Sequence, residues 1–153
     1  MLDQQFQIRR AKAADLDDLV NLENACFAIP WTRKSLQRDL EENSLARYLV
    51  AELPDGTLAG YAACWFVVDE GHVTNIAVLP SWRGQGLGRR LLDELIQLAE
   101  IEKIQLMTLE VRVGNHAARR LYLAGGFQDA GLRRGYYADN NEDAIIMLKL
   151  VND

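Results

Sequence analysis

The sequence predicts an α/β (α+β) fold in which one mixed sheet carries helices on both of its faces. From its start, the chain reads as a strand, two helices, three strands, a helix, a strand, a helix and two strands. Consecutive strands in the first half predict antiparallel pairing, whereas the strand–helix–strand passage across 79–105 predicts a parallel pair with a right-handed crossover. The chain of 153 residues has no linker or internal repeat, which predicts a single domain over residues 1–153.

The first half of the chain contains short strands and two helices with clear boundary signals. Apolar residues and Glu23 recur at helical spacing over 15–27, and Pro30 ends that helix. Thr32 can cap the next helix, and Pro54-Asp55-Gly56 is a strong turn signal between two strands. The expected elements are a strand at 6–9, helices at 15–27 and from about 32 to 42, and strands at 47–53, 58–68 and 72–79.

The second half contains the most regular helix of the chain. Leu87, Leu91 and Leu95 form one apolar stripe, as expected for a helix that packs on a core. Asn115 can cap a later helix, which Gly125-Gly126 ends. The expected elements are a helix at 87–101, a strand at 105–113, a helix at 115–124, and strands at 127–137 and 144–150.

Composition and charge limit the classes of function. Hydrophobic residues make up 49% and charged residues 25% of the chain, as in globular domains. No apolar run approaches the roughly 18 residues of a membrane span, and the N-terminus lacks a signal peptide, so we expect a cytoplasmic protein without a membrane partner. The net charge of −5 argues against direct nucleic-acid binding. Cys26 and Cys64 stand apart, and we expect both to be reduced and buried, with no disulfide and no metal site.

Three glycines, Gly84, Gly86 and Gly88, lie between an expected strand and the long helix, with three arginines within 83–90. The first N–H groups of a helix lack intrahelical acceptors and attract anions, and glycine lets a phosphate approach the backbone closely. These residues predict a phosphate-binding loop rather than a flexible surface loop. The Walker pattern and the dinucleotide GxGxxG fingerprint are both absent.

The segment NIAVLPSWRGQGLGRRLL at 75–92 resembles the acetyl-coenzyme-A motif of the GNAT N-acetyltransferases. The resemblance continues through LEVRVGNHAARRLYLAGGF at 109–127, RRGYYADNNEDAIIM at 133–147 and FAIPW at 27–31. These segments are similar to the branch of the family that consists of bacterial ribosomal-protein alanine N-acetyltransferases. The resemblance implies the GNAT fold, with a mixed seven-stranded, mostly antiparallel sheet, a central parallel strand pair and about four helices.

The resemblance also implies which residues hold the expected co-substrate, acetyl-CoA. Its pyrophosphate would lie on the glycine loop, and its pantetheine arm would pair with backbone groups of the preceding strand as another strand does. The pyrophosphate residues implied are Arg83, Gly84, Gln85, Gly86, Leu87, Gly88 and Arg89, and the pantetheine residues are Ile76, Ala77 and Val78. Asn115 is implied as a further coenzyme contact.

Amine acetylation requires a base to take a proton from the acceptor amine. Glu110 lies in an expected strand, on the face that also carries Thr108 and Arg112. The residues alone leave open whether this carboxylate forms an ion pair with Arg112 or acts as a base, and the resemblance favours the general base. We expect His72 and His116 to have structural or solvated roles.

The departing thiolate must gain a proton, and Tyr122 is the candidate acid. It shares a helical stripe with Asn115 and Ala118. An isolated helical tyrosine is more often a core residue with its hydroxyl at the surface. The resemblance implies that Tyr122 is the general acid, since its phenol is protonated at neutral pH.

The acceptor site is the least determined part of the prediction. Trp31, Tyr136 and Tyr137 are candidate groove residues, although aromatic residues are equally common in cores. Glu142 and Asp143 can attract a basic peptide, although a solvated turn also explains them. The resemblance implies an acceptor that is the N-terminal alanine of a basic small-subunit ribosomal protein.

Two alternatives follow from the same residues. One is an acetyltransferase for a small-molecule amine or a lysine side chain, since Asn140-Asn141 in the variable loop departs from the family pattern and can redirect specificity. The other is a coenzyme-A-binding module without turnover. Glu110 and Tyr122 argue against that module, because a protein that only binds coenzyme needs neither residue.

Overall fold

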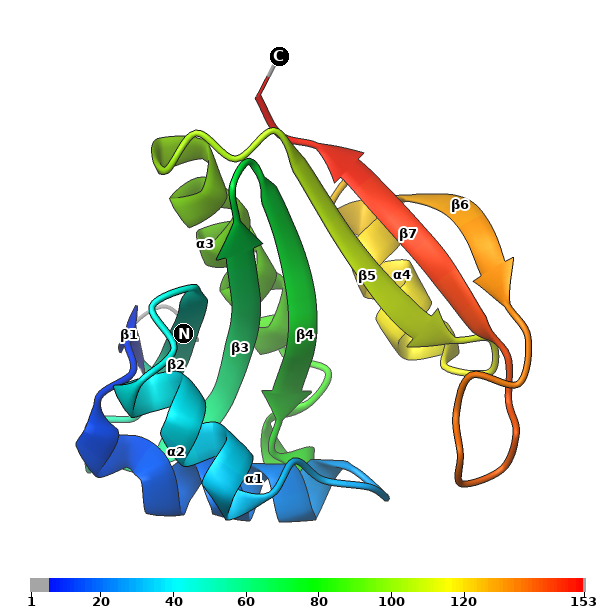
Figure 1. The fold of residues 1–153 in the computed structure, drawn as a ribbon. Coiled ribbons are helices and arrows are strands. Elements are labelled where there is room, and N and C mark those ends of the chain that lie inside the picture. The colour runs from blue at the N-terminus through cyan, green and yellow to red at the C-terminus, as the bar shows by residue number, and fades with distance from the viewer. Residues whose placement is uncertain (1–5, 153) are drawn as a thin grey trace.

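The computed structural model describes residues 6–152, which form one seven-stranded sheet with helices on both faces (Figure 1). The strands are β1 (Gln7–Arg10), β2 (Ala46–Glu52), β3 (Leu58–Val67), β4 (Glu70–Val78), β5 (Leu106–Arg112), β6 (Gln128–Arg133) and β7 (Ala144–Leu150). The helices are α1 (Leu16–Cys26), α2 (Arg33–Glu41), α3 (Leu87–Ile101) and α4 (His116–Ala124). The expected mixed α/β fold is therefore confirmed.

The sheet has the strand order β1-β2-β3-β4-β5-β7-β6, and its one parallel pair is β4 with β5. This pair is short, because Glu70–His72 alone are matched with Leu106–Thr108. Beyond His72 the two strands diverge, as Figure 1 shows for the green β4 and the yellow-green β5. β4 remains paired with β3 along its whole length, and β5 with β7. The sheet therefore forks at its centre.

Two hydrophobic cores lie on the two faces of the sheet. One packs α3, Tyr122 of α4 and Phe127 against the sheet, and the other packs α1 and α2 against Tyr48, Tyr61 and Ala77. Figure 1 shows α1 and α2 in front of the sheet and α3 and α4 behind it. The leucine stripe of α3 is buried as predicted, since Leu87, Leu91 and Leu95 are at most 1% exposed.

A β-bulge in β4 changes which side chains face each core. Asn75 pairs with Ala63 and Val73 pairs with Cys64, so Thr74 is the extra residue. Val73 and Ala77, four residues apart, would share a face in a regular strand, yet Val73 packs on the α3 side and Ala77 on the α1 side. The bulge lies next to the fork and turns Asn75 toward α1.

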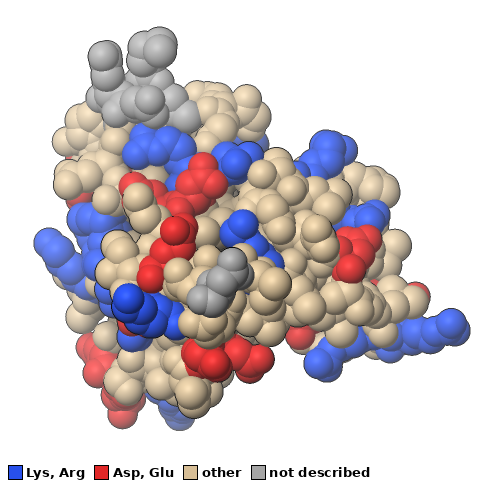
Figure 2. Space-filling model, turned by 90° about the horizontal axis from the view of Figure 1, so that it is seen from above, with Lys and Arg blue, Asp and Glu red and all other residues tan. Residues whose placement is uncertain are grey.

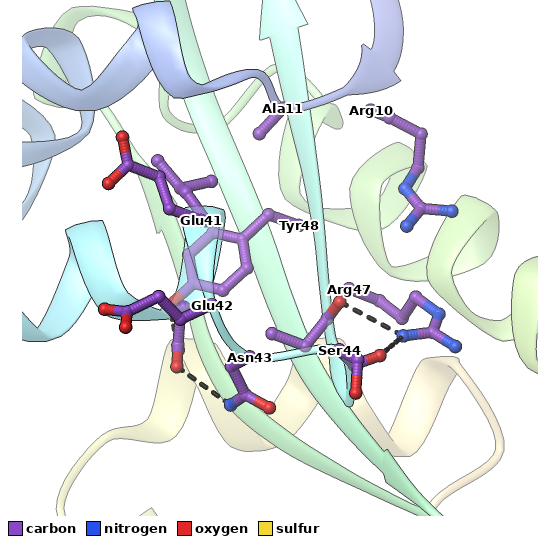
Figure 3. A pocket seen from close by; sticks show the side chains of 11 residues that line it. Arg10, Ala11, Glu41, Glu42, Asn43, Ser44, Arg47 and Tyr48 are labelled. Atoms are coloured by element: carbon purple, nitrogen blue, oxygen red, sulfur yellow. Dashed lines mark hydrogen bonds between the residues drawn. The ribbon is translucent and has the colours of Figure 1, made fainter.

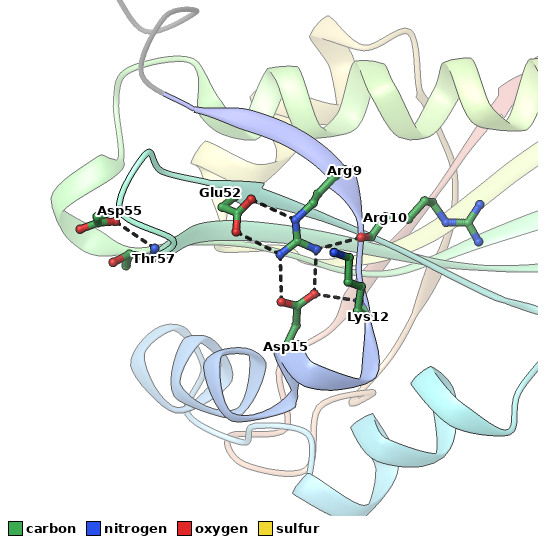
Figure 4. A network of polar contacts seen from close by, with 7 residues as sticks. All are labelled: Arg9, Arg10, Lys12, Asp15, Glu52, Asp55 and Thr57. Atoms are coloured by element: carbon green, nitrogen blue, oxygen red, sulfur yellow. Dashed lines mark hydrogen bonds and ion pairs between the residues drawn. The ribbon is translucent and has the colours of Figure 1, made fainter.

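A cluster of charged residues fastens the start of α1 to the first two strands (Figure 4). Arg9 donates to both oxygens of Asp15, at 2.9 and 3.0 Å, and to Glu52. The backbone N–H of Lys12 also donates to Asp15, at 2.7 Å. The hydrogen bonds from Arg9 hold the pKa of Asp15 below its ordinary value, although burial opposes them.

The structure corrects several boundaries predicted from sequence. The strand expected over 127–137 ends at Arg133, because Gly135 adopts a left-handed φ of +60° and its N–H donates to Asp143. β4 begins at Glu70 rather than at His72. Cys26 is half-buried rather than buried, whereas Cys64 is buried as expected, and both thiols are free.

Charged side chains of both signs are mixed over the face drawn in Figure 2, where no large area is basic alone. Among residues 6–152, no helix is long and apolar enough to cross a membrane. The same residues contain no group of three or more His, Cys, Asp or Glu side chains arranged to hold a metal ion.

Candidate active site

The glycine loop lies between β4 and α3, and its backbone is left-handed at two positions. The φ angle is +76° at Gly84 and +86° at Gly86, and Gly86 is the N-cap of α3. Both angles are costly for any residue with a Cβ. A Cβ placed on Gly84 would meet no protein atom within 4 Å, so the space above this residue is open. The first turn of α3 thus presents its N–H groups beside an exposed, open backbone.

The arginines of the loop already have protein partners. Arg83 Nε donates to the carbonyl of Val78 at 2.9 Å, and Arg89 Nε donates to Asp93 at 2.9 Å. The guanidinium of Arg90 lies 5.1 Å from the ring centre of Phe6. Arg83 and Arg89 are exposed, so their charge still adds to the positive potential of the helix N-terminus.

The segment Ile76–Val78 borders the fork between β4 and β5. The N–H of Leu79 donates to Ala59 in β3, so the alternate residues Ile76 and Val78 direct their backbone groups away from β3. The carbonyl of Val78 also accepts from Cys26 Sγ, at 3.4 Å. Backbone groups on this side of β4 therefore face the fork, with the Val78 carbonyl already in use.

Glu110 lies on β5 just beyond the last matched pair of the fork. Burial alternates along β5 as predicted: Met107, Leu109 and Val111 are buried on the face of the strand opposite to Glu110. The ion pair with Arg112, one of the two alternatives, does not form, because Arg112 pairs with Asp139 and Glu142. The partner of Glu110 is instead His72, whose Nε2 lies 2.6 Å from Glu110 Oε2.

Tyr122 lies on α4, on the opposite side of β5 from Glu110. Asn115 caps α4 as predicted, accepting from the N–H of Ala118 at 3.2 Å. Tyr122 is 8% exposed and packs edge-to-face on Phe127. Burial raises the pKa of its hydroxyl well above the ordinary value, and the nearby Tyr137 adds to this. The proton therefore stays on Tyr122 throughout the neutral range.

The loop between β6 and β7 brings two predicted acceptor residues together. The rings of Tyr136 and Tyr137 meet at 89° with centres 5.0 Å apart, and Arg112 lies 3.9 Å from the centre of the Tyr137 ring. Burial raises the pKa of Tyr137 to about 12. Tyr137 interacts electrostatically with both Glu110 and Tyr122, which places it near both predicted catalytic residues.

Glu142 binds the end of β5 and the turn that follows it, and Asp143 binds within the β6–β7 loop. Glu142 accepts from Arg112 and from the N–H of Gly114, the latter at 2.7 Å, and Asp143 accepts from Gly135 at 2.8 Å. Their contacts give both carboxylates a role in shaping the loop. They leave less free negative charge for an acceptor than the sequence alone suggested.

Trp31 is fixed through a buried carboxylate that sequence reasoning did not single out as a site residue. Glu23 is fully buried, and it accepts from the N–H of Trp31 at 2.6 Å, from Asn75 at 2.9 Å and from the Tyr61 hydroxyl. Burial raises the pKa of Glu23, and these hydrogen bonds partly oppose that rise. A carboxylate within the apolar stripe of α1 was the available signal. Glu23 thus links α1, β3, β4 and the 27–31 segment.

His72 is also part of this region, although we expected only a structural or solvated role for it from the sequence. Its contact with Glu110 depends on the register of a parallel strand pair, which no short-range pattern reveals. His116 is exposed at the start of α4, in keeping with its expected solvated role.

Two cavities lie elsewhere, around the end of α2. One of about 320 Å³ is bordered by Arg10, Asn43, Arg47 and Tyr48 (Figure 3), and one of about 280 Å³ lies between Trp31 and Trp65. Neither is lined by the glycine loop, Glu110 or Tyr122. The second cavity shares Trp31 with the predicted acceptor residues, and neither cavity reaches the fork.

Comparisons with known proteins identify the family of this chain. The model of the acetyltransferase (GNAT) family matches residues 16–127. A Bacillus subtilis protein named "putative ribosomal protein bS18-alanine N-acetyltransferase" is 42% identical over 146 residues, covering 95% of this chain and 96% of that protein. The Escherichia coli K12 protein named ribosomal protein bS18-alanine N-acetyltransferase is 40% identical over 143 residues, covering 92% and 94%.

Similarity of structure extends along the same length. The crystal structure of the ribosomal-protein-S18-alanine N-acetyltransferase from Escherichia coli superposes with a TM-score of 0.89 at 35% identity, covering 97% of this chain and 95% of that one. The family match covers most of the chain, and the relatives align almost from end to end. The chain belongs to the GNAT acetyltransferase family and is an acyltransferase.

Proposed function

We propose that this enzyme transfers an acetyl group from acetyl-CoA to the N-terminal α-amine, alanine in particular, of a basic small-subunit ribosomal protein. The observation that carries the proposal is the fork between β4 and β5, which has the glycine loop at its open end and Glu110 and Tyr122 on either side of β5. The names of the relatives support the acceptor. Such an acceptor places the reaction in the cytoplasm, and we propose that residues 1–153 form one domain.

Acetyl-CoA, which GNAT acetyltransferases use, supplies the acetyl group as a thioester, and the glycine loop suits its pyrophosphate. The open space above Gly84 and the left-handed backbone let phosphate oxygens reach the N–H groups of the loop and of the first turn of α3. The proposed pyrophosphate residues are those of 83–89. The backbone groups of Ile76 and the N–H of Val78, which face the fork, suit the pantetheine amides, with Ala77 between these two residues. Asn115, which follows β5, is the proposed further coenzyme contact.

Glu110 is the proposed general base. An N-terminal α-ammonium has an ordinary pKa near 8, so it must lose a proton before its nitrogen can attack the acetyl carbonyl. Glu110 accepts that proton, directly or through one water molecule. Its position just beyond the last β4–β5 pair puts the carboxylate at the vertex of the fork.

Tyr122 is the proposed general acid. When the carbon–sulfur bond breaks, the sulfur carries the negative charge, and a neutral hydroxyl nearby can donate a proton to it. The raised pKa of Tyr122 keeps the hydroxyl protonated, so a proton is present when the thiolate departs. Among residues 6–152 no side chain or carbonyl accepts a hydrogen bond from this hydroxyl, which leaves it available for the sulfur.

The acceptor groove is proposed to lie between the 27–32 segment and the β6–β7 loop. Trp31 and Tyr136 are partly exposed, at 36% and 46%, so both can contact a peptide. Tyr137 borders the catalytic residues, and Glu142 and Asp143 hold the loop in shape. The aromatic side chains would contact the first residues of the acceptor, and the loop acids would add negative potential for a basic segment.

A competition among three acceptors tests the proposal. The acceptors are an alanine-initiated basic peptide, the same peptide with a blocked N-terminus and free lysines, and a polyamine, with acetylated products located by tandem mass spectrometry. Acetylation of the free α-amine alone supports the proposal. Preference for lysines or the polyamine would overturn the acceptor. Coenzyme binding without turnover on any acceptor would favour the binding module instead.

A further inference from the structure

A side-chain contact between His72 and Glu110 lies at the vertex of the fork. His72 is the last residue of β4 matched with β5, and Glu110 lies two residues beyond its match, Thr108. The Nε2 atom of His72 and the Oε2 atom of Glu110 are 2.6 Å apart. The histidine side chain is 43% exposed and the glutamate side chain is 16% exposed. The contact therefore joins the two strands where they separate, with its carboxylate end inside the site.

The chemistry of the two groups fixes the direction of this hydrogen bond. An ionised carboxylate can only accept, so the imidazole must carry its proton on Nε2 and donate it to Glu110. A hydrogen bond to a charged acceptor is shorter and stronger than one between neutral groups. Oε2 is thereby held in place, and no residue within 6–152 donates to Oε1. One oxygen of the carboxylate is anchored while the other is free to accept a proton.

The cation nearest to Glu110 along β5 is bound to other residues, so His72 is the residue that anchors Glu110. Arg112, the nearest cation along β5, is bound to Asp139 and Glu142. On the β3 side, Trp65 is matched with His72, and the Trp65 indole donates to Asp39 at 3.1 Å. The histidine is thus held between two strands, with Glu110 as the acceptor of its Nε2.

We propose that His72 is a positioning residue for the reaction, orienting the Glu110 carboxylate so that Oε1 faces the acceptor amine. The inference rests on the proposed role of Glu110 as the base and adds the group that makes that base effective. A side chain that is free to rotate would spend much of its time with neither oxygen directed at the amine. Holding one oxygen on the opposite strand removes that freedom without consuming the oxygen that takes the proton.

Four variants test this positioning role: His72→Leu, His72→Gln, Glu110→Gln and the double variant His72→Leu/Glu110→Gln. Loss of a hydrogen bond to a charged group predicts that His72→Leu lowers kcat roughly ten- to a hundredfold, with the KM for acetyl-CoA within about twofold. His72→Gln, which keeps an N–H donor of similar reach, should restore most of the rate. The double variant should be no slower than Glu110→Gln alone, because His72 acts only through Glu110.

A measurement without substrate complements the kinetics. In the free protein, proton NMR of isotope-labelled histidine should show a downfield, exchange-protected imidazole N–H for His72, which moves upfield in Glu110→Gln. Equal thermal unfolding of the His72 variants excludes a folding defect as the cause of slow turnover.

The possible outcomes distinguish the positioning role of His72 from the proposed role of Glu110 as the base. Normal kcat in His72→Leu, or rate losses that multiply in the double variant, would overturn the positioning role while leaving Glu110 as the base. Failure of His72→Gln to recover activity would contradict the hydrogen-bond explanation. Unchanged turnover in Glu110→Gln would instead refute the proposed base, and the inference with it.

Discussion

A matched pair of variants, Gly84→Ala and Gly56→Ala, can separate the effect of backbone strain on stability from the effect of the glycine loop on coenzyme binding. Gly84 and Gly56 both have left-handed φ angles, +76° and +92°, and a Cβ on either would meet no atom within 4 Å. Alanine at each position therefore introduces backbone strain without a steric clash. Gly84 lies in the loop before α3, whereas Gly56 lies in the turn between β2 and β3, where its N–H donates to Leu53.

The two variants should lose similar stability. A left-handed conformation costs an L-residue about 1–2 kcal/mol, which for a chain of this size lowers Tm by roughly 2–8 °C. Relaxation of that strain in Gly84→Ala moves loop N–H groups away from the pyrophosphate. Loss of one hydrogen bond to a charged group weakens coenzyme-A binding about ten- to a hundredfold. Gly56→Ala should bind coenzyme A like the unaltered enzyme.

Isothermal titration with coenzyme A, alongside thermal unfolding of both variants, measures the two effects. The reasoning holds if the unfolding shifts are alike and Gly84→Ala alone loses affinity. Undiminished affinity in Gly84→Ala, or an equal loss in Gly56→Ala, would refute the assignment of the pyrophosphate to this loop.

Two further predictions concern catalysis and stability. Tyr122→Phe should lower kcat by about a hundredfold or more while the Kd for acetyl-CoA stays within about twofold, and unchanged turnover in steady-state assays would exclude an acid role. Asp15→Asn should lower the free energy of unfolding at pH 7 by about 1–3 kcal/mol, because it weakens the paired bonds from Arg9. The pKa of Asp15 is lowered in the fold, so its contribution is present above its ordinary pKa and lost as the pH falls through the lowered value. Denaturation curves of the two proteins should therefore converge below about pH 4, and a constant gap at all pH values would contradict this account. The exposed Asp93→Asn serves as the control, with an expected change within about 0.5 kcal/mol.

Features set by short-range chemistry could be predicted from the sequence. The leucine stripe determined the bounds of α3, and Thr32 and Asn115 cap their helices through their own side chains. The glycines at 84 and 86 allow the positive φ angles that the loop adopts there. Each of these signals lies within a few residues of its effect, so no tertiary information was needed.

Features set by contacts between distant segments could not be predicted in this way. Glu110 was expected either to pair with Arg112 or to act as a base, and its observed partner comes from β4, 38 positions earlier in the chain. Arg112 instead reaches a loop that begins after the end of β6. Glu23 has partners on three other segments. The register of the parallel pair and the bulge at Thr74 decide these contacts, and neither leaves a pattern in the sequence.

The most direct test of the account is a crystal structure of the enzyme with coenzyme A and an alanine-initiated peptide. We expect pyrophosphate oxygens about 3 Å from N–H groups of Gly84–Gly88, the sulfur beside the Tyr122 hydroxyl, and the peptide amine facing Glu110 Oε1. A pyrophosphate bound away from this loop, or a peptide amine on the far side of β5 from Glu110, would contradict it.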